Sequence, residues 1–396
     1  MSHRVFITGV GLISAIGDTP EENWQSLVEG KSGIGTAKYV DSKLTDRFVF
    51  GEVPHSNEEL KQIAGLPSDA NFARTSLLAF IAAGEALLQA GLTSSEIDGI
   101  IMGCTVSSMC ETQKLYENAQ GIDNGSMLYD RYDIGSVAME VSEYLGHIPY
   151  HNTINTACSS SANAIMQGVM MIRSGRAKRV LVGGADALSK YTINGFNSMM
   201  LLSEQRCSPF SGNRDGINLG EGAGFLVLEG EESIASKPVL AEVEGFGNAN
   251  DSYHATSTSP EATGPTSAMQ KALRTAGISS EEVQYINAHG TGTENNDETE
   301  FQAIRKVFDK QIPLYASTKA YTGHTLGAAG SIETIFSLLM LRHQTVIGGN
   351  YTLTHDDKIS ILPLEASKKV PLRRVMSNAF GFGGNCTSLI LKAGRE

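Results

Sequence analysis

Short apolar runs and longer apolar runs alternate along this chain, and the two kinds predict different elements. The short runs, such as RVFITGV, DGIIMG and RVLVGGADA, are bounded by glycine or polar residues and predict strands. The longer runs, SLLAFIAAGEALLQA and SANAIMQGVMMIRSG, repeat apolar residues at helical spacing and predict helices with a buried face. Strands that alternate with helices in this way predict an α/β fold built in layers.

A break in the pattern near residues 230–238 divides the chain in two. The stretch GEESIASKP is polar and ends in proline, and a new strand-like run, PVLAEVEGFG, begins there. We therefore expect two halves, residues 1–235 and residues 236–396.

The two halves share a weak internal repeat. Residues 153–184 and residues 314–349 each pass from a strand through a chemically reactive residue and a small-residue helix start into an apolar helix and a further strand. Cys158 and His324 occupy similar places in the two copies. This repeat predicts a duplicated fold with a functional site at its centre.

Charge and composition argue against several classes of protein. The 396 residues carry a formal net charge of -12, which disfavours nucleic acid or an anionic membrane surface as the main partner. No run reaches the roughly 18 apolar residues that a membrane-spanning helix needs, and the apolar start MSHRVFITGVGLISAIG predicts a first strand and not a signal peptide. Five cysteines at irregular spacing indicate neither a disulfide framework nor a zinc site, so we expect a reduced, cytoplasmic chain.

Two glycine-rich stretches invite a nucleotide-binding interpretation that their surroundings do not support. GVGLIS at residues 9–14 follows a strand, but it lacks the third glycine of the dinucleotide motif, so a tight structural turn is favoured. LGEGAGFLVLE at residues 219–229 leads into a strand and offers no helix N-terminus for a phosphate. We interpret it as a place where backbones pack closely.

The stretch NTACSSSAN places Cys158 just before an apolar helix, in which Ile165, Val169 and Ile172 recur at helical spacing. A thiol at a helix N-terminus faces unpaired N–H groups, and the positive end of the helix dipole would lower its pKa and favour the thiolate. Such a cysteine can be a nucleophile. A small buried core residue is the alternative, and position alone leaves both interpretations open.

Two histidines favour the catalytic interpretation of Cys158. His289 follows a strand-like run and opens a loop of small residues, HGTGT, which leaves room for a slender ligand near the backbone. His324 lies in TGHTLGAAG, ahead of a long apolar helix. Each histidine alone is as compatible with a structural role as with a catalytic one. Together with Cys158 they form the set that carbon–carbon bond formation on thioesters requires.

Several specific motifs occur in one order along nearly the whole chain. They are VFITGVGLISAIG, TACSSSANAI, RVLVGGADA, NRDGINLGEGAGFLVLE, NAHGTGTENNDETE, STKAYTGHTLGAAGSIE and NAFGFGG. By these motifs the chain resembles the β-ketoacyl-[acyl-carrier-protein] synthases of the thiolase superfamily, most closely the type I and II elongating enzymes. The resemblance implies a thiolase-like fold of duplicated halves in a five-layered αβαβα arrangement.

The resemblance also implies roles for individual residues. Cys158 takes an acyl chain from a carrier-protein thioester, and His289 and His324 act on malonyl-carrier protein. Loss of carbon dioxide leaves enolate charge that two N–H donors stabilise, and the carbanion attacks the acyl carbonyl to release a 3-oxoacyl chain two carbons longer. Lys319 supports the site electrostatically, and Glu333 orients Lys319 or ordered water.

Substrate binding and partners are implied in the same way. The backbone N–H groups of Cys158 and Phe380 form the oxyanion hole, the Phe380 ring gates access to Cys158, and Thr291 and Thr293 hydrogen-bond the pantetheine arm. No metal or nucleotide cofactor is implied, because the phosphopantetheine arrives on the acyl carrier protein. That acidic carrier protein and a second copy of the chain, in a homodimer, are the implied partners. Candidate carrier contacts, which are also compatible with plain solvated helix ends, are Arg74, Arg173, Arg176, Lys178 and Arg179.

Five positions depart from the family pattern. Ser211 and Ile217 stand where relatives usually carry an acid and an aromatic residue, and Ile217 is expected to reshape the acyl pocket. Asn385 and Cys386 follow GFGG in place of Thr-Asn; we expect Cys386 to be a packing residue, the alternative being a site more sensitive to oxidation. Thr325 falls between the residues usual in type I and type II enzymes, which leaves the chain-length class open.

These departures keep two pathways open, housekeeping fatty acid synthesis and a specialised polyene or polyketide pathway. A thiolase is disfavoured because Cys386 lies after the late glycine run, and the initiating synthases carry asparagine where this chain has His324. A non-catalytic chain-length partner subunit is also disfavoured, since such subunits usually lack the nucleophile and this chain retains Cys158.

Overall fold

A ten-stranded mixed sheet runs through the structure and consists of two five-stranded halves. The computed structural model describes residues 4–110, 133–234, 237–309 and 311–394. The first half contains β1 (Val5–Ser14), β4 (Gly99–Gly103), β5 (His151–Ile154), β6 (Arg179–Asp186) and β7 (Gly222–Gly230). The second half contains β8 (Ala241–Asn250), β9 (Tyr285–Asn287), β10 (Leu314–Ala316), β13 (Arg374–Phe380) and β14 (Asn385–Ala393).

The two halves have the same strand order when each is followed outward from the centre. The first runs β1-β7-β6-β4-β5 and the second runs β8-β14-β13-β9-β10. In each half the two inner pairings are antiparallel and the two outer pairings are parallel. Among the described strands, the two half-sheets pair with each other through β1 and β8, where Phe6 and Ile7 pair with Glu242 and Ala241. The duplication that the internal repeat predicted is therefore confirmed.

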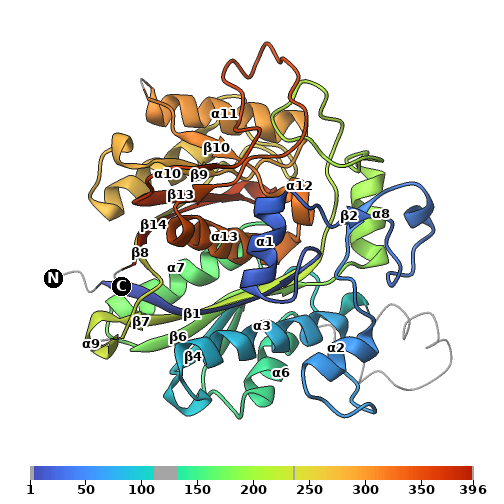
Figure 1. Ribbon diagram of the computed structural model, residues 1–396, viewed down its shortest axis with the longest axis vertical. Coiled ribbons are helices and arrows are strands. Elements are labelled where there is room, and N and C mark those ends of the chain that lie inside the picture. The colour runs from blue at the N-terminus through green and yellow to red at the C-terminus, as the bar shows by residue number, and fades with distance from the viewer. Residues whose placement is uncertain (1–3, 111–132, 235–236, 310, 395–396) are drawn as a thin grey trace.

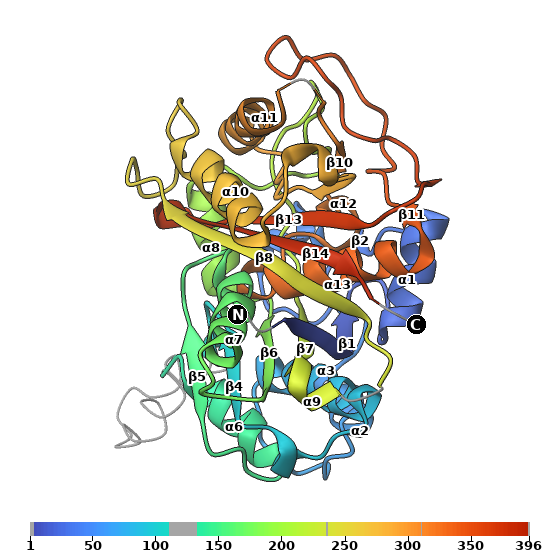
Figure 2. The ribbon, with the colours of Figure 1, turned by 90° about the vertical axis from the view of Figure 1, so that its left-hand side faces the viewer.

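Helices form three layers around the two half-sheets (Figures 1 and 2). The outer layers contain α3 and α6 on one side and α10 and α11 on the other, and α7 and α13 fill the space between the sheets. The α-helices are α1 (Pro20–Glu29), α2 (Asn57–Ile63), α3 (Arg74–Ala90), α6 (Ser136–Tyr144), α7 (Ser160–Arg173), α8 (Lys190–Ser198), α9 (Glu231–Ile234), α10 (Thr263–Ala276), α11 (Glu294–Phe308), α12 (Lys319–Thr322) and α13 (Ala329–His343). The result is the αβαβα arrangement that the family resemblance implied.

Short elements connect these layers. Two strand pairs lie outside the large sheet, β2 (Ile34–Gly35) with β3 (Phe50–Gly51) and β11 (Thr345–Val346) with β12 (Lys368–Lys369). Single 3-10 turns are η1 (Lys43–Asp46), η2 (Ser94–Glu96), η3 (Ser280–Glu282), η4 (Leu326–Ala328) and η5 (Phe382–Gly384).

The central helices are apolar because both of their faces meet a sheet. In α13 every residue from Ala329 to Leu341 is buried, and the helix packs against β7, β13, β14 and α7. A helix enclosed on all sides needs apolar or small residues around its whole circumference. This explains why the amphipathic pattern is weakest in the helix that supports the centre of the molecule.

The glycine stretch GVGLIS lies inside β1, so the turn expected there is wrong. Gly9 and Gly11 face α3, and a Cβ atom built on Gly11 would lie 2.0 Å from the carbonyl oxygen of Ala82. The glycines let the backbone of α3 approach the strand closely, and the strand carries a bulge between Ile7 and Gly9. The expected close packing at LGEGAGFLVLE is confirmed, since a Cβ on Gly220 would lie 2.1 Å from the Thr322 carbonyl oxygen.

The boundary expected between residues 235 and 236 falls outside the described residues. Among the helices that the structure describes, none is both long enough and apolar enough to cross a lipid bilayer.

Candidate active site

Cys158 lies in the turn that connects β5 to α7, at the centre of the molecule. Ala157 just before it has a φ of 53°, a left-handed conformation that bends the chain sharply between the strand and the helix. The Ser160 hydroxyl accepts a hydrogen bond from the Thr156 N–H at 2.9 Å and fixes this turn. Cys158 is only 6% exposed, and it lines a cavity. The turn therefore presents a buried thiol to this cavity.

The expected lowering of the Cys158 pKa is wrong. Burial raises the pKa of this thiol to about 11, because a thiolate there loses its hydration. The positive charge of Lys319 and the backbone N–H groups of Phe382 and Cys158 act in the opposite direction without outweighing burial. At neutral pH the resting group is the thiol, and the helix N-terminus does not ionise it.

Both histidines reach Cys158 from the second half of the fold. His289 follows β9, and His324 lies between α12 and α13. Their rings are 5.3 Å apart and nearly perpendicular, at 84°. Ligand atoms of Cys158, His289 and His324 all lie within 4.8 Å of one another, so the three residues that the sequence singled out converge.

The histidines are neutral at physiological pH. Burial lowers the pKa of each ring well below its usual value, and the nearby Lys319 charge lowers it further. Within the described part of the chain, neither ring nitrogen of His324 has a hydrogen-bond partner. A neutral imidazole presents one N–H donor and one acceptor, so this ring is available to a bound substrate.

Lys319 and Glu333 form a buried ion pair behind His289. The Lys319 ammonium lies 2.5 Å from Glu333 Oε1, 2.6 Å from the His289 carbonyl oxygen and 3.4 Å from His289 Nδ1. Burial raises the pKa of Glu333 to about 7, and the Lys319 charge opposes that rise. Because an ammonium can only donate, His289 Nδ1 acts as the acceptor and the ring proton is on Nε2.

Sequence reasoning missed the carboxylates that hold the HGTGT loop. Glu300 on α11 accepts hydrogen bonds from the backbone N–H groups of His289 and Gly290, both at 2.8 Å. Asp297, one turn earlier, accepts from the N–H groups of Thr291 and Gly292. The available signal was their spacing of three residues in ENNDETE, which places both on one helix face directly after the loop.

Sequence reasoning also missed Asp186, a carboxylate of the first half that likewise holds backbone N–H groups. Its buried carboxylate accepts from the N–H groups of Thr105 and Val106, which follow β4, and from Gly327 N at 2.7 Å. Gly327 belongs to the turn just after His324. Asp186 therefore ties the first half-sheet to the segment that carries His324.

The oxyanion-hole role expected of the Phe380 backbone does not fit the structure. Phe380 is the last residue of β13, where it pairs with Cys386 of β14. The backbone N–H groups that face the Cys158 sulfur are those of Phe382 and, as expected, of Cys158 itself. Phe380 instead lies beside His289, with the two ring centres 5.8 Å apart. The strand ends at Phe380, and only beyond it does the chain turn its N–H groups toward the thiol.

A cavity of about 540 Å³ lies above Cys158 and leads to the surface. Both phenylalanines border it, and the half-buried Phe382 ring stacks on Phe196 with ring centres 5.7 Å apart. Among the residues that the sequence singled out, the cavity is lined by Cys158, Ile217, His289, Thr291, Thr293, His324 and Phe380. The Thr291 and Thr293 hydroxyls are 2.8 Å apart, so they present a paired hydrogen-bonding edge. Lys319 and Glu333 are not part of the cavity wall.

Two of the departures have structural explanations. Cys386 is buried against Ala249, Ala268 and Phe380, and burial raises its pKa, so it is the packing residue that we expected. The Asn385 amide oxygen accepts hydrogen bonds from Ser159 and from two further asparagines, which fixes the strand next to the Cys158 turn.

The basic residues proposed as carrier contacts divide into two kinds. Arg74 is buried and bound to Glu221 at 2.6 Å, so the expectation that it meets a carrier protein is wrong. Arg173 is half-buried and donates to backbone carbonyls of β8, and Arg179 pairs with a buried carboxylate on β7. The exposed members of the set are Arg176 and Lys178.

A buried cysteine and two neutral histidines that meet at the centre of a duplicated αβαβα fold define the class of thiolase-like condensing enzymes. The comparisons are more specific. Residues 2–233 match the description "Beta-ketoacyl synthase, N-terminal domain", and residues 240–348 match "Beta-ketoacyl synthase, C-terminal domain". The chain belongs to the beta-ketoacyl synthase family.

Individual relatives are similar over their whole length. The chain is 33% identical to 3-oxoacyl-[acyl-carrier-protein] synthase 2 of Staphylococcus aureus (strain COL), over 98% of each chain. It is 35% identical to Nodulation protein E of Rhizobium meliloti (strain 1021), over 99% of this chain and 100% of that one. Among solved structures, the ishigamide ketosynthase/chain length factor has a TM-score of 0.90 and 31% identity, over 99% of this chain and 100% of that one.

A second solved structure contains a carrier protein. It is AntDE:AntF, described as a type II polyketide synthase acyl-carrier protein in complex with its ketosynthase bound to the hexaketide. Its TM-score is 0.86 at 27% identity, and the similarity covers 99% of this chain and 100% of that one.

Proposed function

We propose that this beta-ketoacyl synthase is an acyltransferase that lengthens an acyl chain by two carbons, using malonyl-carrier protein as the donor. The observation that carries the proposal is the convergence of Cys158, His289 and His324 within 4.8 Å at the base of one cavity. Each of the three can be assigned a role in a decarboxylative condensation.

The first step loads the acyl chain. Cys158 Sγ attacks the thioester carbonyl of an acyl-pantetheine, the carbon–sulfur bond to pantetheine breaks, and the thiol proton leaves on the pantetheine sulfur. The backbone N–H groups of Cys158 and Phe382 face this sulfur and stabilise the oxyanion. Because the resting thiol has a raised pKa, its proton is lost during the reaction and not before it.

The second step generates the carbon nucleophile. The malonyl carbon–carbon bond breaks, carbon dioxide leaves, and the electron pair forms an enolate on the thioester oxygen. His289 Nε2–H and an N–H of His324 donate to that oxygen. The enolate carbon then attacks the acyl carbonyl, the bond to Cys158 breaks, and the thiolate takes up a proton from water. Lys319 and Glu333 act by fixing the His289 tautomer.

The cavity explains how the substrate reaches these groups. Thr291 and Thr293 hold the pantetheine arm along the cavity wall, and Ile217 lines the same cavity. We assign the gating role to Phe382 instead of Phe380, since Phe382 is half-buried in a turn with glycines on both sides while Phe380 is fixed in β13.

We further propose that no metal or bound cofactor takes part. One thiol and two imidazoles are chemically able to bind zinc. However, the buried ammonium of Lys319 contacts His289 directly and would face any bound cation. The phosphopantetheine arrives on the carrier protein.

For partners we propose an acyl carrier protein and a second copy of the chain, within the cytoplasm. A second candidate is a ketosynthase paired with a chain-length factor in a specialised polyene or polyketide pathway. It is favoured by the similarity to the ishigamide ketosynthase/chain length factor and to the ketosynthase ApeO, solved in complex with its chain length factor ApeC. Fatty acid synthesis is favoured by the similarity to 3-oxoacyl-[acyl-carrier-protein] synthase 2.

Intact-mass spectrometry of wild type and Cys158→Ala tests the function. Wild type incubated with acyl-carrier proteins, saturated and polyunsaturated, should gain the acyl mass and lose it when malonyl-carrier protein is added, with release of the 3-oxoacyl product. Cys158→Ala should take no acyl chain and still release carbon dioxide from malonyl-carrier protein, because both histidines remain. The preferred chain distinguishes the two pathways, and elongation by Cys158→Ala would contradict the proposal.

A further inference from the structure

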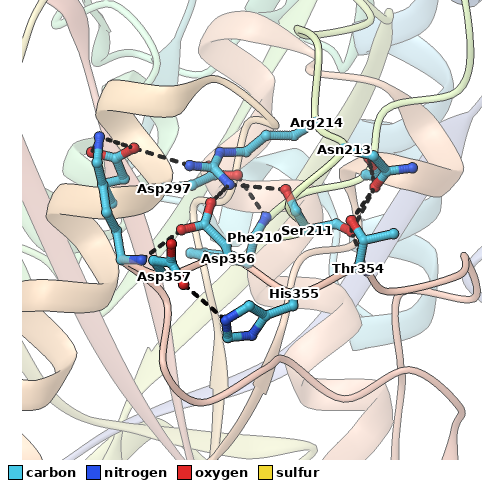
Figure 3. Close-up of polar contacts among 12 residues, drawn as sticks. Phe210, Ser211, Asn213, Arg214, Asp297, Thr354, His355, Asp356 and Asp357 are labelled. Atoms are coloured by element: carbon cyan, nitrogen blue, oxygen red, sulfur yellow. Dashed lines mark hydrogen bonds and ion pairs between the residues drawn. The ribbon is translucent and has the colours of Figure 1, made fainter.

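A buried arginine outside the catalytic set joins three segments of the chain (Figure 3). The Arg214 side chain is 4% exposed. Its guanidinium donates to the carbonyl oxygen of Ser211 at 2.9 Å, to Glu298 Oε1 at 3.1 Å and to the Asp356 carboxylate. Within the described part of the chain its Nε has no partner. Arg214 thus connects its own loop to α11 and to the segment that contains Asp356.

Two of the joined segments form neighbouring parts of the cavity wall. Residues 214–217 and residues 291–296 both line the cavity, and they touch each other, since a Cβ atom built on Gly292 would lie 2.7 Å from the Gly216 carbonyl oxygen. Asp297, beside Glu298 on α11, accepts from Phe210 N at 2.7 Å and from Thr291 N at 3.0 Å, so it links the same loop to the HGTGT segment.

The third segment is held to the same loop independently of the ion pair. Thr354 N donates to the Ser211 hydroxyl at 2.8 Å, and both side chains contact the Asn213 amide oxygen (Figure 3). Unlike the Ser211, Asn213 and Thr354 side chains, the Arg214 side chain carries a full charge, and a buried charge without its partner is costly. The Asp356 carboxylate therefore decides where the guanidinium, and the backbone next to it, can lie.

We propose that Asp356 is a positioning residue for the substrate channel: through Arg214 it holds residues 214–217 in place against residues 291–296, so that the two segments form one continuous part of the wall. The pantetheine arm must pass along this wall to bring its thioester carbonyl to Cys158. A channel that widens or tilts would weaken binding of the arm without altering the thiol itself. This inference rests on the proposed function.

The neighbouring residue supplies a matched control. Asp357 is 98% exposed and, among the described residues, forms an ion pair with His355, which is itself 79% exposed. Asp356→Asn and Asp357→Asn remove the same charge one residue apart, so a general loss of negative charge affects both variants equally. Asp356→Glu keeps the charge and serves as the conservative variant.

The test compares the reaction of Cys158 with a long substrate and with a small reagent. For each variant we would measure Cys158 acylation by an acyl-pantetheine thioester over a range of concentrations, Cys158 alkylation by iodoacetamide, and thermal unfolding. For Asp356→Asn we expect KM for the thioester to rise by about fivefold to tenfold, with kcat and the iodoacetamide rate within about twofold of wild type. Asp356→Glu should recover much of the loss, and Asp357→Asn should match wild type.

Three results would overturn the inference. One is an unchanged KM in Asp356→Asn, and another is a parallel fall of thioester and iodoacetamide rates, which would indicate only a structural role. A wild-type protein that takes no acyl chain would remove the proposed function and this inference with it, whereas the first two results leave that function intact. If Asp356→Asn does not fold, Glu298→Gln, which removes the other carboxylate from Arg214, should give the same rise in KM.

Discussion

At the scale of single residues, Cys158 shows two opposing effects on one thiol. The start of α7 and the Lys319 charge favour the thiolate, while burial removes the water that would stabilise it, and burial is the larger effect. The buried neutral histidines follow the same logic, since burial disfavours their charged forms. The site therefore rests as an uncharged triad next to a Lys319–Glu333 ion pair, and charge appears only when a thioester reacts.

This balance predicts the pH dependence of Cys158 alkylation. With a pKa of about 11, the thiolate fraction rises tenfold for each pH unit, so the iodoacetamide rate should keep rising from about pH 7 to about pH 10. A thiol ionised by the helix terminus would reach its plateau near neutral pH. Mass spectrometry of the alkylated peptide provides the rate, and Cys158→Ala corrects for other cysteines. A plateau below about pH 9 would contradict the raised pKa.

At the scale of elements, the contact between β1 and α3 depends on the absence of side chains. A Cβ on Gly11 would lie 2.0 Å from the Ala82 carbonyl oxygen, which is backbone of a buried helix and cannot move aside. Gly11→Ala should therefore separate the helix from the strand and destabilise the protein by about 3 kcal/mol or more. Gly195→Ala is the control, because Gly195 lies in α8 with open space around it, and alanine there should be neutral or stabilise by up to about 1 kcal/mol. Urea unfolding measures both, and equal midpoints would contradict the packing argument.

The same contact shows why parts of the structure could be predicted and others could not. The helices α3 and α7 and the strands β1, β4, β6 and β7 followed from local apolar patterns, and the family motifs identified the cysteine and both histidines. The glycines of β1 suggested a turn because their sequence neighbours are compatible with one. Their actual partner, α3, lies some seventy residues away, and no local pattern contains that information.

Contacts between residues that are distant in the sequence explain why sequence reasoning missed or misassigned other residues of the site. Asp186, Glu300 and Asp356 act on residues that are distant in the sequence or on the far side of a loop, and their acidic character alone predicts a solvated surface. The family resemblance pointed to Phe380 in NAFGFGG, but which phenylalanine N–H faces the thiol depends on where β13 ends, and that end is set by pairing with β14.

At the scale of the whole molecule, neither half can form the site alone. Cys158 belongs to the first half, and His289, His324 and Lys319 belong to the second. The half-sheets share only two residue pairs, between β1 and β8, so α7 and α13 provide most of the contact that keeps the halves aligned. The packing of α7 against α13 therefore keeps the catalytic residues of the two halves in position.

One edge of this assembly points to a second copy of the chain. The strand β5 pairs with β4 on one side and is the last strand of the sheet as described, so its outer edge presents backbone groups that another strand can bind. Beside it, α7 carries Met170, 52% exposed, next to an open groove of about 530 Å³. An exposed edge and an apolar groove together suit a self-complementary interface.

We therefore expect the protein to be a dimer whose interface includes Met170. In a twofold interface each substitution occurs twice, so Met170→Glu buries two unpaired charges and should weaken association by at least about a hundredfold. Leu88→Glu is the control, since Leu88 is 81% exposed on α3 in the outer layer and the same charge there should leave the dimer intact. Sedimentation over a range of concentrations distinguishes the outcomes. A monomeric wild type would favour the alternative in which this face awaits a chain-length partner, and a Met170→Glu protein that still dimerises would place the interface elsewhere.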